Sequence, residues 1–216
     1  MSSSLKLYSY WRSSASYRVR IALNLKGLHY EIIPVNLVAG EQASSEFDAR
    51  NPQHMVPVLM HGERVMRQSL AILEWLEENY EGGYPLLAGP KRDRARIRAI
   101  AHLIASDIAP INVLRVVNYL GKHHHFDETD KKTWMLHWMK EGLDALEVLL
   151  DNPSTGSFCE GDEPTMADCC LIPQVYNALR WHMDMTAYPR IMAIYTHALT
   201  LPEFANAAPE AQVDAT

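Results

Sequence analysis

The chain has 216 residues, of which 48% are hydrophobic and 21% charged, a composition typical of a globular protein rather than a disordered one. Its formal net charge is −6, which argues against nucleic acid as the main partner because backbone phosphates would be repelled. No continuous apolar run approaches the roughly 18 residues of a membrane span, so we expect no membrane partner either.

The cysteine content argues against a disulfide framework. Cys159, Cys169 and Cys170 are odd in number and two of them are adjacent, which suits a reducing compartment and predicts a cytoplasmic protein. No zinc-ligand spacing is present. The run at 123–125 is three histidines, but adjacent imidazoles converge poorly on one ion, so we expect a solvated loop there and no metal.

Short strands and helices alternate in the first third of the chain. Gly27 is a plausible helix end, because glycine tolerates the left-handed conformation. Hydrophobic periodicity predicts a strand at 5–9, a helix at 16–26, a strand at 29–35, a short helix around Phe47, strands at 56–59 and 64–66, and a helix at 72–80.

Glycines and prolines at 82–90 interrupt this pattern, and beyond them the sequence is almost entirely helical in character. We therefore predict two domains, an α/β domain at 1–84 and an all-helical domain at 90–216. In the second, Thr165 followed by Asp168 resembles a capping box and predicts a helix start.

The first 30 residues have an alternative interpretation. They contain several serines, no acidic residue and five cations, a composition also typical of an organellar transit peptide. The same stretch reads well as a strand followed by a helix, and we favour the folded interpretation.

A serine-rich turn joins the first predicted strand to the first predicted helix. The hydroxyls of Ser13, Ser14 and Ser16 suit helix capping, and they also suit donation to an anion held at the positive helix end. A thiolate placed there would be stabilised, which would lower its pKa. From this turn alone, simple capping remains the alternative.

Two further segments suit a peptide-like ligand. Extended backbone at Val56, before Pro57, could pair with a ligand's backbone, although an edge-strand proline is the alternative. Gln68 and Ser69 precede the third predicted helix and could hold a carboxylate and an amine, or only cap the helix. Together with the serine turn, these segments match the three parts of glutathione.

Residues 12–23 (RSSASYRVRIAL) resemble the signature of the zeta class of glutathione transferases. The resemblance extends from about residue 5 to 214 and includes Asn51-Pro52, Val56-Pro57, 68–72 (QSLAI), Gly161-Asp162, 165–168 (TMAD), 171–175 (LIPQV) and 184–189 (DMTAYP). It implies the glutathione transferase fold, with a thioredoxin-like α/β N-terminal domain that binds glutathione. The all-α C-terminal domain would bind substrate and form a homodimer.

The resemblance also implies residue roles. The hydroxyl of Ser13 would face the glutathione sulfur, with Ser14 as its neighbour and partial alternate. The dianionic substrate would be held by Arg180, with Arg12 as a second candidate, although a surface ion pair is the alternative for Arg180. The implied glutathione contacts are Ser13, Ser14, Val56, Pro57, Gln68, Ser69, Asn112 and Arg115.

Two positions depart from the class pattern. Ala15 stands where the signature commonly has cysteine, which puts a covalent role for a protein thiol in doubt. Ala109 stands where relatives often have a polar residue that reaches glutathione.

The implied activity is the glutathione-dependent cis–trans isomerisation of maleylacetoacetate, a small dicarboxylate, to fumarylacetoacetate in tyrosine and phenylalanine catabolism. One alternative is a maleylpyruvate isomerase of aromatic-acid degradation, which neighbouring genes would distinguish. Another is a non-catalytic glutathione-binding protein.

Overall fold

The computed structural model describes residues 4–216, and residues 1–3 lie outside this described part. The chain forms two compact units, one comprising the residues up to Leu87 together with Leu199–Thr216, and the other Ala88–Ala198. The predicted second domain, 90–216, therefore extends beyond the observed second unit, which ends at Ala198. Residues 199–216 pack with the first unit because side chains of the helix Ser14–Leu25 (α1) bind their backbone: Asn24 donates to the Glu203 carbonyl at 2.9 Å.

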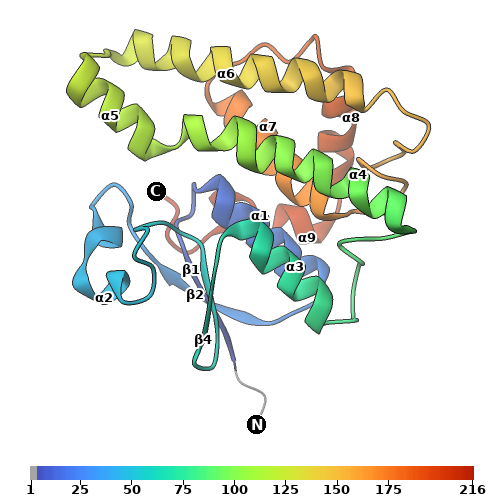
Figure 1. Ribbon diagram of the computed structural model, residues 1–216, viewed down its shortest axis with the longest axis horizontal. Coiled ribbons are helices and arrows are strands. Elements are labelled where there is room, and N and C mark those ends of the chain that lie inside the picture. The colour runs from blue at the N-terminus through green and yellow to red at the C-terminus, as the bar shows by residue number, and fades with distance from the viewer. Residues whose placement is uncertain (1–3) are drawn as a thin grey trace. The chain divides into compact units, whose positions relative to one another are not determined.

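The first unit has the predicted order β-α-β-α-β-β-α (Figure 1). The described part of the first 30 residues, for which a transit peptide was the alternative, contains β1 and α1, as the favoured interpretation predicted. Its elements are β1 (Leu5–Ser9), α1 (Ser14–Leu25), β2 (Tyr30–Pro34), η1 (Glu41–Ala43), α2 (Ser45–Asp48), β3 (Val58–His61), β4 (Arg64–Arg67), α3 (Ser69–Asn79), and then α9 (Pro202–Ala205) and η4 (Pro209–Ala211) from the C-terminal segment.

The four strands form one mixed sheet in the order β2-β1-β3-β4. β1 pairs in parallel with β2, which requires a crossover, and α1 supplies it. The pairs β1–β3 and β3–β4 are antiparallel. Along β1 the side chains alternate: Leu5 and Leu7 are buried, whereas Tyr8 points to the opposite face and packs edge-on against Phe47 of α2. Helices α1 and α3 pack against each other (Figure 1).

The end of α1 is fastened to the segment that leaves α3. Gly27 has φ +65°, which confirms the predicted helix stop. Lys26 forms a buried ion pair with Glu77 of α3 at 2.6 Å. The Tyr84 N–H donates to the Leu25 carbonyl at 2.9 Å, which brings the neighbouring Gly83 close to α1. These bonds hold α3 and the segment that follows it against the C-terminal end of α1.

The second unit is helical, as predicted. It contains α4 (Lys91–His102), the π-helical η2 (Leu103–Ile108), the 3₁₀-helical η3 (Ala109–Asn112), α5 (Leu114–His124), α6 (Glu128–Leu149), α7 (Met166–Arg180) and α8 (Pro189–Ala198). The stretch Lys91–His124 is long and apolar enough, by length and composition only, to cross a membrane, and a third of its most apolar window is buried. Core helices of soluble proteins meet the same criterion of length and composition. Because Asp107 and Arg115 lie within this stretch, no continuous apolar run stands out in the sequence.

Two local predictions in this unit have different outcomes. The capping box at the start of α7 is confirmed: Thr165 accepts from the helix, and Asp168 accepts from the Thr165 N–H at 2.8 Å. The predicted histidine loop was wrong in part, because His123 and His124 form the last turn of α5. The last turn also contains Lys122, a cation that is favourable at a helix C-terminus. Within residues 4–216, no group of three His, Cys, Asp or Glu side chains could hold a metal.

Candidate active site

Three predicted segments of the first unit meet at one end of the sheet because of strand direction. The serine turn follows β1, Val56 and Pro57 precede β3, and Gln68 follows β4. β3 is antiparallel to both of its neighbours, β1 and β4, so the start of β3 lies beside the ends of these two strands. Val58 is opposite Tyr8 of β1 and Arg67 of β4. The topology therefore brings together the segments that the sequence analysis assigned to glutathione.

Ser13 is the N-cap of α1. Its Oγ accepts a hydrogen bond from the Ser16 N–H at 3.2 Å, which leaves the hydroxyl hydrogen available for a further bond. No acidic residue lies in the first turn of α1 itself, which leaves the N–H groups at this end of the helix able to attract an anion. Both Ser13 and Ser14 are half-buried. Capping and anion binding are thus compatible here, because they use different atoms of Ser13.

Val56 presents unpaired backbone. The Val56–Pro57 peptide bond is cis. Within the described chain, neither the N–H nor the C=O of Val56 forms a hydrogen bond to another backbone group. The Val56 side chain is buried with Tyr10 and Val58 in a small apolar cluster that also contacts Trp11. Buried packing therefore holds the position while its backbone polar groups stay available to a ligand.

Gln68 has a strained backbone. Its φ of +67° and ψ of 117° lie outside the regions that non-glycine residues ordinarily occupy. Such conformations cost about 1–3 kcal/mol and cluster at ligand-binding sites. Gln68 occupies the N-cap position of α3 but its side chain makes no capping bond; its amide instead donates to Gln53 at 2.8 Å. The alternative in which Gln68 and Ser69 serve only to cap α3 therefore finds no support, because no side-chain capping bond is present at this helix start.

Ser69 is the first residue of α3 and is buried. Its Oγ accepts a hydrogen bond from the buried Arg18 guanidinium of α1 at 3.2 Å. Accepting this bond leaves the Ser69 hydroxyl hydrogen to donate elsewhere, as suits a carboxylate. Sequence reasoning missed Arg18 as a support for the site. The sequence did contain a signal: Arg18 lies within the apolar stripe of the predicted first helix, and a buried cation normally has hydrogen-bond partners.

Asn112, Arg115 and Arg180 belong to the second unit. Asn112 is buried at the end of η3, and neither its amide nitrogen nor its amide oxygen has a partner among the described residues. A buried amide without partners costs about 1–3 kcal/mol, which favours a ligand contact. Arg115 is exposed on α5.

The two predicted substrate cations are both exposed. Arg12 lies over the Trp11 ring, 5.3 Å from its centroid. Arg180, the last residue of α7, donates to the Asn177 side-chain oxygen at 3.0 Å and lies over the Trp181 ring. Stacking on an aromatic ring restrains a guanidinium while keeping its charge accessible.

The protein's own thiols are poor nucleophiles. All three cysteines are buried. Burial raises the pKa of the Cys159 thiol well above its ordinary value, and the neighbouring Asp168 raises it further. Burial likewise raises the pKa of Cys169. Since the thiolate is the reactive form, sulfur chemistry at this site requires a thiol from outside the chain.

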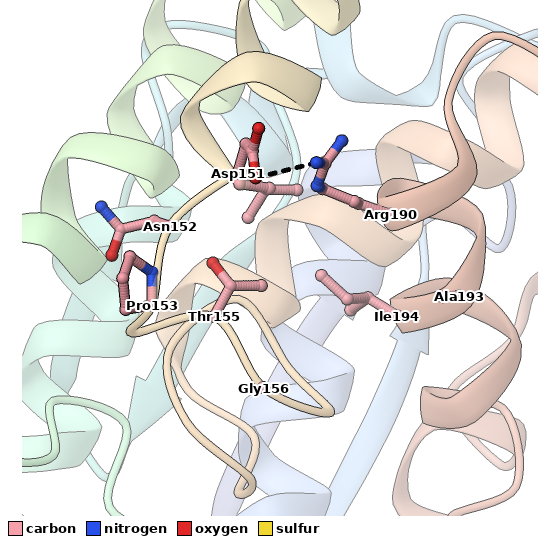
Figure 2. A pocket seen from close by; sticks show the side chains of 9 residues that line it. Asp151, Asn152, Pro153, Thr155, Gly156, Arg190, Ala193 and Ile194 are labelled. Carbon is pink, nitrogen blue, oxygen red and sulfur yellow. Dashed lines mark ion pairs between the residues drawn. The ribbon is translucent and has the colours of Figure 1, made fainter.

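A cavity of about 470 Å³ lies elsewhere, in the second unit (Figure 2). The loop 150–156 and the start of α8 line it, and none of the predicted site residues does. Its arginine, Arg190, is paired with Asp151 at 2.8 Å and with Glu147 at 3.4 Å. A cation already neutralised by two carboxylates is a weak anchor for a dicarboxylate, so we do not place the reaction there.

The sheet is thioredoxin-like and a helical unit follows it. The serine turn, the unpaired backbone of Val56 and the strained Gln68 meet at one end of this sheet. These features together define the class of glutathione-binding transferases. The family model described as "Glutathione S-transferase, N-terminal domain" matches residues 3–78. The maleylacetoacetate isomerase of Rhizobium meliloti (strain 1021) is 48% identical over 211 residues, which cover 97% of this chain and 98% of that protein.

Two solved structures are similar over nearly the whole chain. One is the holo structure of a maleyl pyruvate isomerase described as a bacterial zeta-class glutathione S-transferase, with a TM-score of 0.95, 45% identity, and coverage of 98% of this chain and 100% of that one. The other is a maleylacetoacetate isomerase from Methylobacterium extorquens AM1 with bound malonate and glutathione, with a TM-score of 0.94, 40% identity, and coverage of 98% and 99%. The chain belongs to the glutathione S-transferase family, in its zeta class.

Proposed function

We propose that this protein is a glutathione-dependent isomerase that converts maleylacetoacetate to fumarylacetoacetate. The observation that carries the proposal is the meeting of three segments at one end of the sheet, each with polar groups suited to a different part of glutathione. Relatives that bear the name of this activity are similar over nearly the full chain, and one structural neighbour holds glutathione and malonate, itself a small dicarboxylate.

The residues of the first unit fit glutathione along its length. Ser13, with Ser14 beside it, faces the sulfur. The free backbone of Val56, set by Pro57, pairs with the cysteinyl part. Gln68 and Ser69 hold the γ-glutamyl end, and in the second unit Asn112 and Arg115 complete the glutathione contacts. When bound, glutathione supplies a thiolate that adds reversibly to the cis double bond and so permits rotation.

The chain's own contribution is to keep that thiol ionised and to orient both molecules. Ser13 donates its hydroxyl hydrogen to the sulfur while its Oγ caps α1, so one hydroxyl serves both bonds. The positive end of α1, whose first turn holds no acidic residue, adds to this stabilisation. Both effects favour the anion and lower the pKa of the thiol.

Arg12 and Arg180 hold the substrate carboxylates. Their guanidinium groups are exposed and restrained by stacking on Trp11 and Trp181. The Arg180→Ala variant should raise the KM for the dicarboxylate about tenfold or more with a smaller change in kcat, because a charge-assisted bond to the substrate is lost. Arg92→Ala removes the same charge from a side chain that is 88% exposed on α4 and serves as the control. Equal kinetics for both variants would refute the assignment.

Maleylpyruvate is the second candidate substrate, because one structural neighbour is named for its isomerisation. It shares the cis double bond conjugated to a carbonyl and the two carboxylates, so the residues above would serve either compound. We favour maleylacetoacetate, the substrate for which the Rhizobium relative at 48% identity is named. We also propose a cytoplasmic homodimer that acts in tyrosine and phenylalanine catabolism.

The test is isomerisation monitored by absorbance with each substrate in parallel, with and without glutathione. A glutathione-dependent rate that is faster on maleylacetoacetate supports the proposal. A faster rate on maleylpyruvate would assign the second activity. If calorimetry shows glutathione binding but neither substrate reacts, the chain is a binding protein and not an isomerase.

A further inference from the structure

The segment 199–216 holds the backbone of the serine turn. The Trp11 N–H donates to Oδ2 of Asp214 at 3.0 Å, across 203 residues of sequence. The Trp11 carbonyl accepts from the Arg20 guanidinium at 2.9 Å. Both backbone polar groups of Trp11 are thus occupied, two residues before the Ser13 hydroxyl.

Arg20 connects the same turn to the C-terminal segment a second time. Its side chain is fully buried in α1. It donates to the Ala207 carbonyl at 2.9 Å and to Oγ of Ser9, at the end of β1, at 3.1 Å. One guanidinium therefore joins the strand before the turn, the turn itself and the C-terminal segment.

The C-terminal segment is itself well anchored. Phe204 and Ala207 are fully buried. The Gln212 side-chain amide donates to the carbonyls of Asn206 at 3.1 Å and Ala208 at 2.8 Å. Asp214 lies two residues after Gln212, so bonds within the C-terminal segment hold this carboxylate beside the serine turn.

We infer that Asp214 is a positioning residue for the glutathione-dependent reaction, acting through the Trp11 backbone to hold the Ser13 hydroxyl at the sulfur. The inference rests on the proposed function. Asp214 would act mainly on the sulfur end, because Gln68 and Ser69 are held by contacts that do not involve Trp11. A loosened turn should therefore impair thiol activation more than glutathione binding.

The test compares Asp214→Ala, Asp214→Asn and Val213→Ala. Val213 is adjacent and 80% exposed, so its variant controls for changes in the segment that leave the bond intact. Asparagine removes the charge but keeps an acceptor oxygen, which separates the hydrogen bond from the electrostatic effect. The readouts are kcat and KM, the pH titration of bound glutathione by thiolate absorbance, and hydrogen exchange at the Trp11 amide.

For Asp214→Ala we expect faster exchange at Trp11, a higher pKa of the bound thiol and a kcat/KM lowered about 3- to 10-fold, with glutathione affinity changed less. Asp214→Asn should recover most of the activity, and Val213→Ala should match the wild type. A wild-type thiol titration and kcat/KM in Asp214→Ala would overturn the inference. Should that variant fold poorly, Asp214→Leu, an apolar side chain without an acceptor oxygen, takes its place, and a wild-type thiol titration in that variant would equally overturn the inference.

The thiol titration and the exchange measurement need glutathione but no isomerisation. If the wild-type enzyme proves inactive on both substrates, the proposed function fails, while these two readouts still decide whether Asp214 positions the turn.

Discussion

The serine turn permits a test that separates helix capping from catalysis. In Ser13→Ala the α1 cap is lost, which should cost about 1 kcal/mol of stability. The control is Ser44→Ala, because Ser44 caps α2 in the same unit and its Oγ accepts from the Phe47 N–H at the same 3.2 Å. Both variants should lose similar stability in denaturant unfolding.

Only Ser13→Ala should lose activity. A hydrogen bond to a charged group contributes about 1.5–3 kcal/mol, which corresponds to about a 10- to 150-fold lower kcat/KM near neutral pH. The pKa of bound glutathione should rise, whereas Ser13→Thr, which keeps the hydroxyl, should retain more activity. Wild-type kcat/KM in Ser13→Ala, with loss in Ser14→Ala instead, would transfer the role to Ser14. Full activity in both variants would refute the mechanism.

Two further predictions concern the fastening of α1. Gly83→Ala should destabilise the protein by more than about 1 kcal/mol in thermal unfolding, because φ of Gly83 is +70° and a Cβ there would lie 2.1 Å from the Leu25 carbonyl oxygen. The control, Gly82→Ala, should be neutral, because the space around Gly82 is open. Burial tends to raise the pKa of Glu77, but hydrogen bonds from Lys26 and two backbone N–H groups outweigh it and hold the pKa below 4.5. This stabilisation is present above the ordinary pKa of a glutamate and is lost as pH falls through the lower folded-state value. The wild type should therefore lose more stability than Glu77→Gln as the pH is lowered past the ordinary value. Parallel losses in the two proteins would contradict this.

Much of the first unit could be predicted from sequence because its elements are short and strongly patterned. Alternation gave β1 at its observed bounds, and the hairpin and α3 lie within a few residues of the prediction. The capping box of Thr165 and Asp168 was predictable for the same reason: the bonds join residues three positions apart.

Features that depend on distant contacts could not be predicted. Nothing local indicates that Gln68 adopts a positive φ, because tertiary context must impose such a conformation. Likewise, the return of residues 199–216 to α1 rests on bonds such as Arg20 to Ala207, which are 187 residues apart. The predicted roles of the site residues stay predictions, since contacts within the chain cannot assign them.

The central claim is that glutathione serves as a cofactor that is regenerated. The most direct measurement supplies glutathione in an amount well below that of maleylacetoacetate and follows both to completion. The account predicts full conversion to fumarylacetoacetate with all glutathione recovered as free thiol. Conversion that stops when the glutathione is exhausted, with a stable conjugate as product, would contradict it and leave a conjugating transferase.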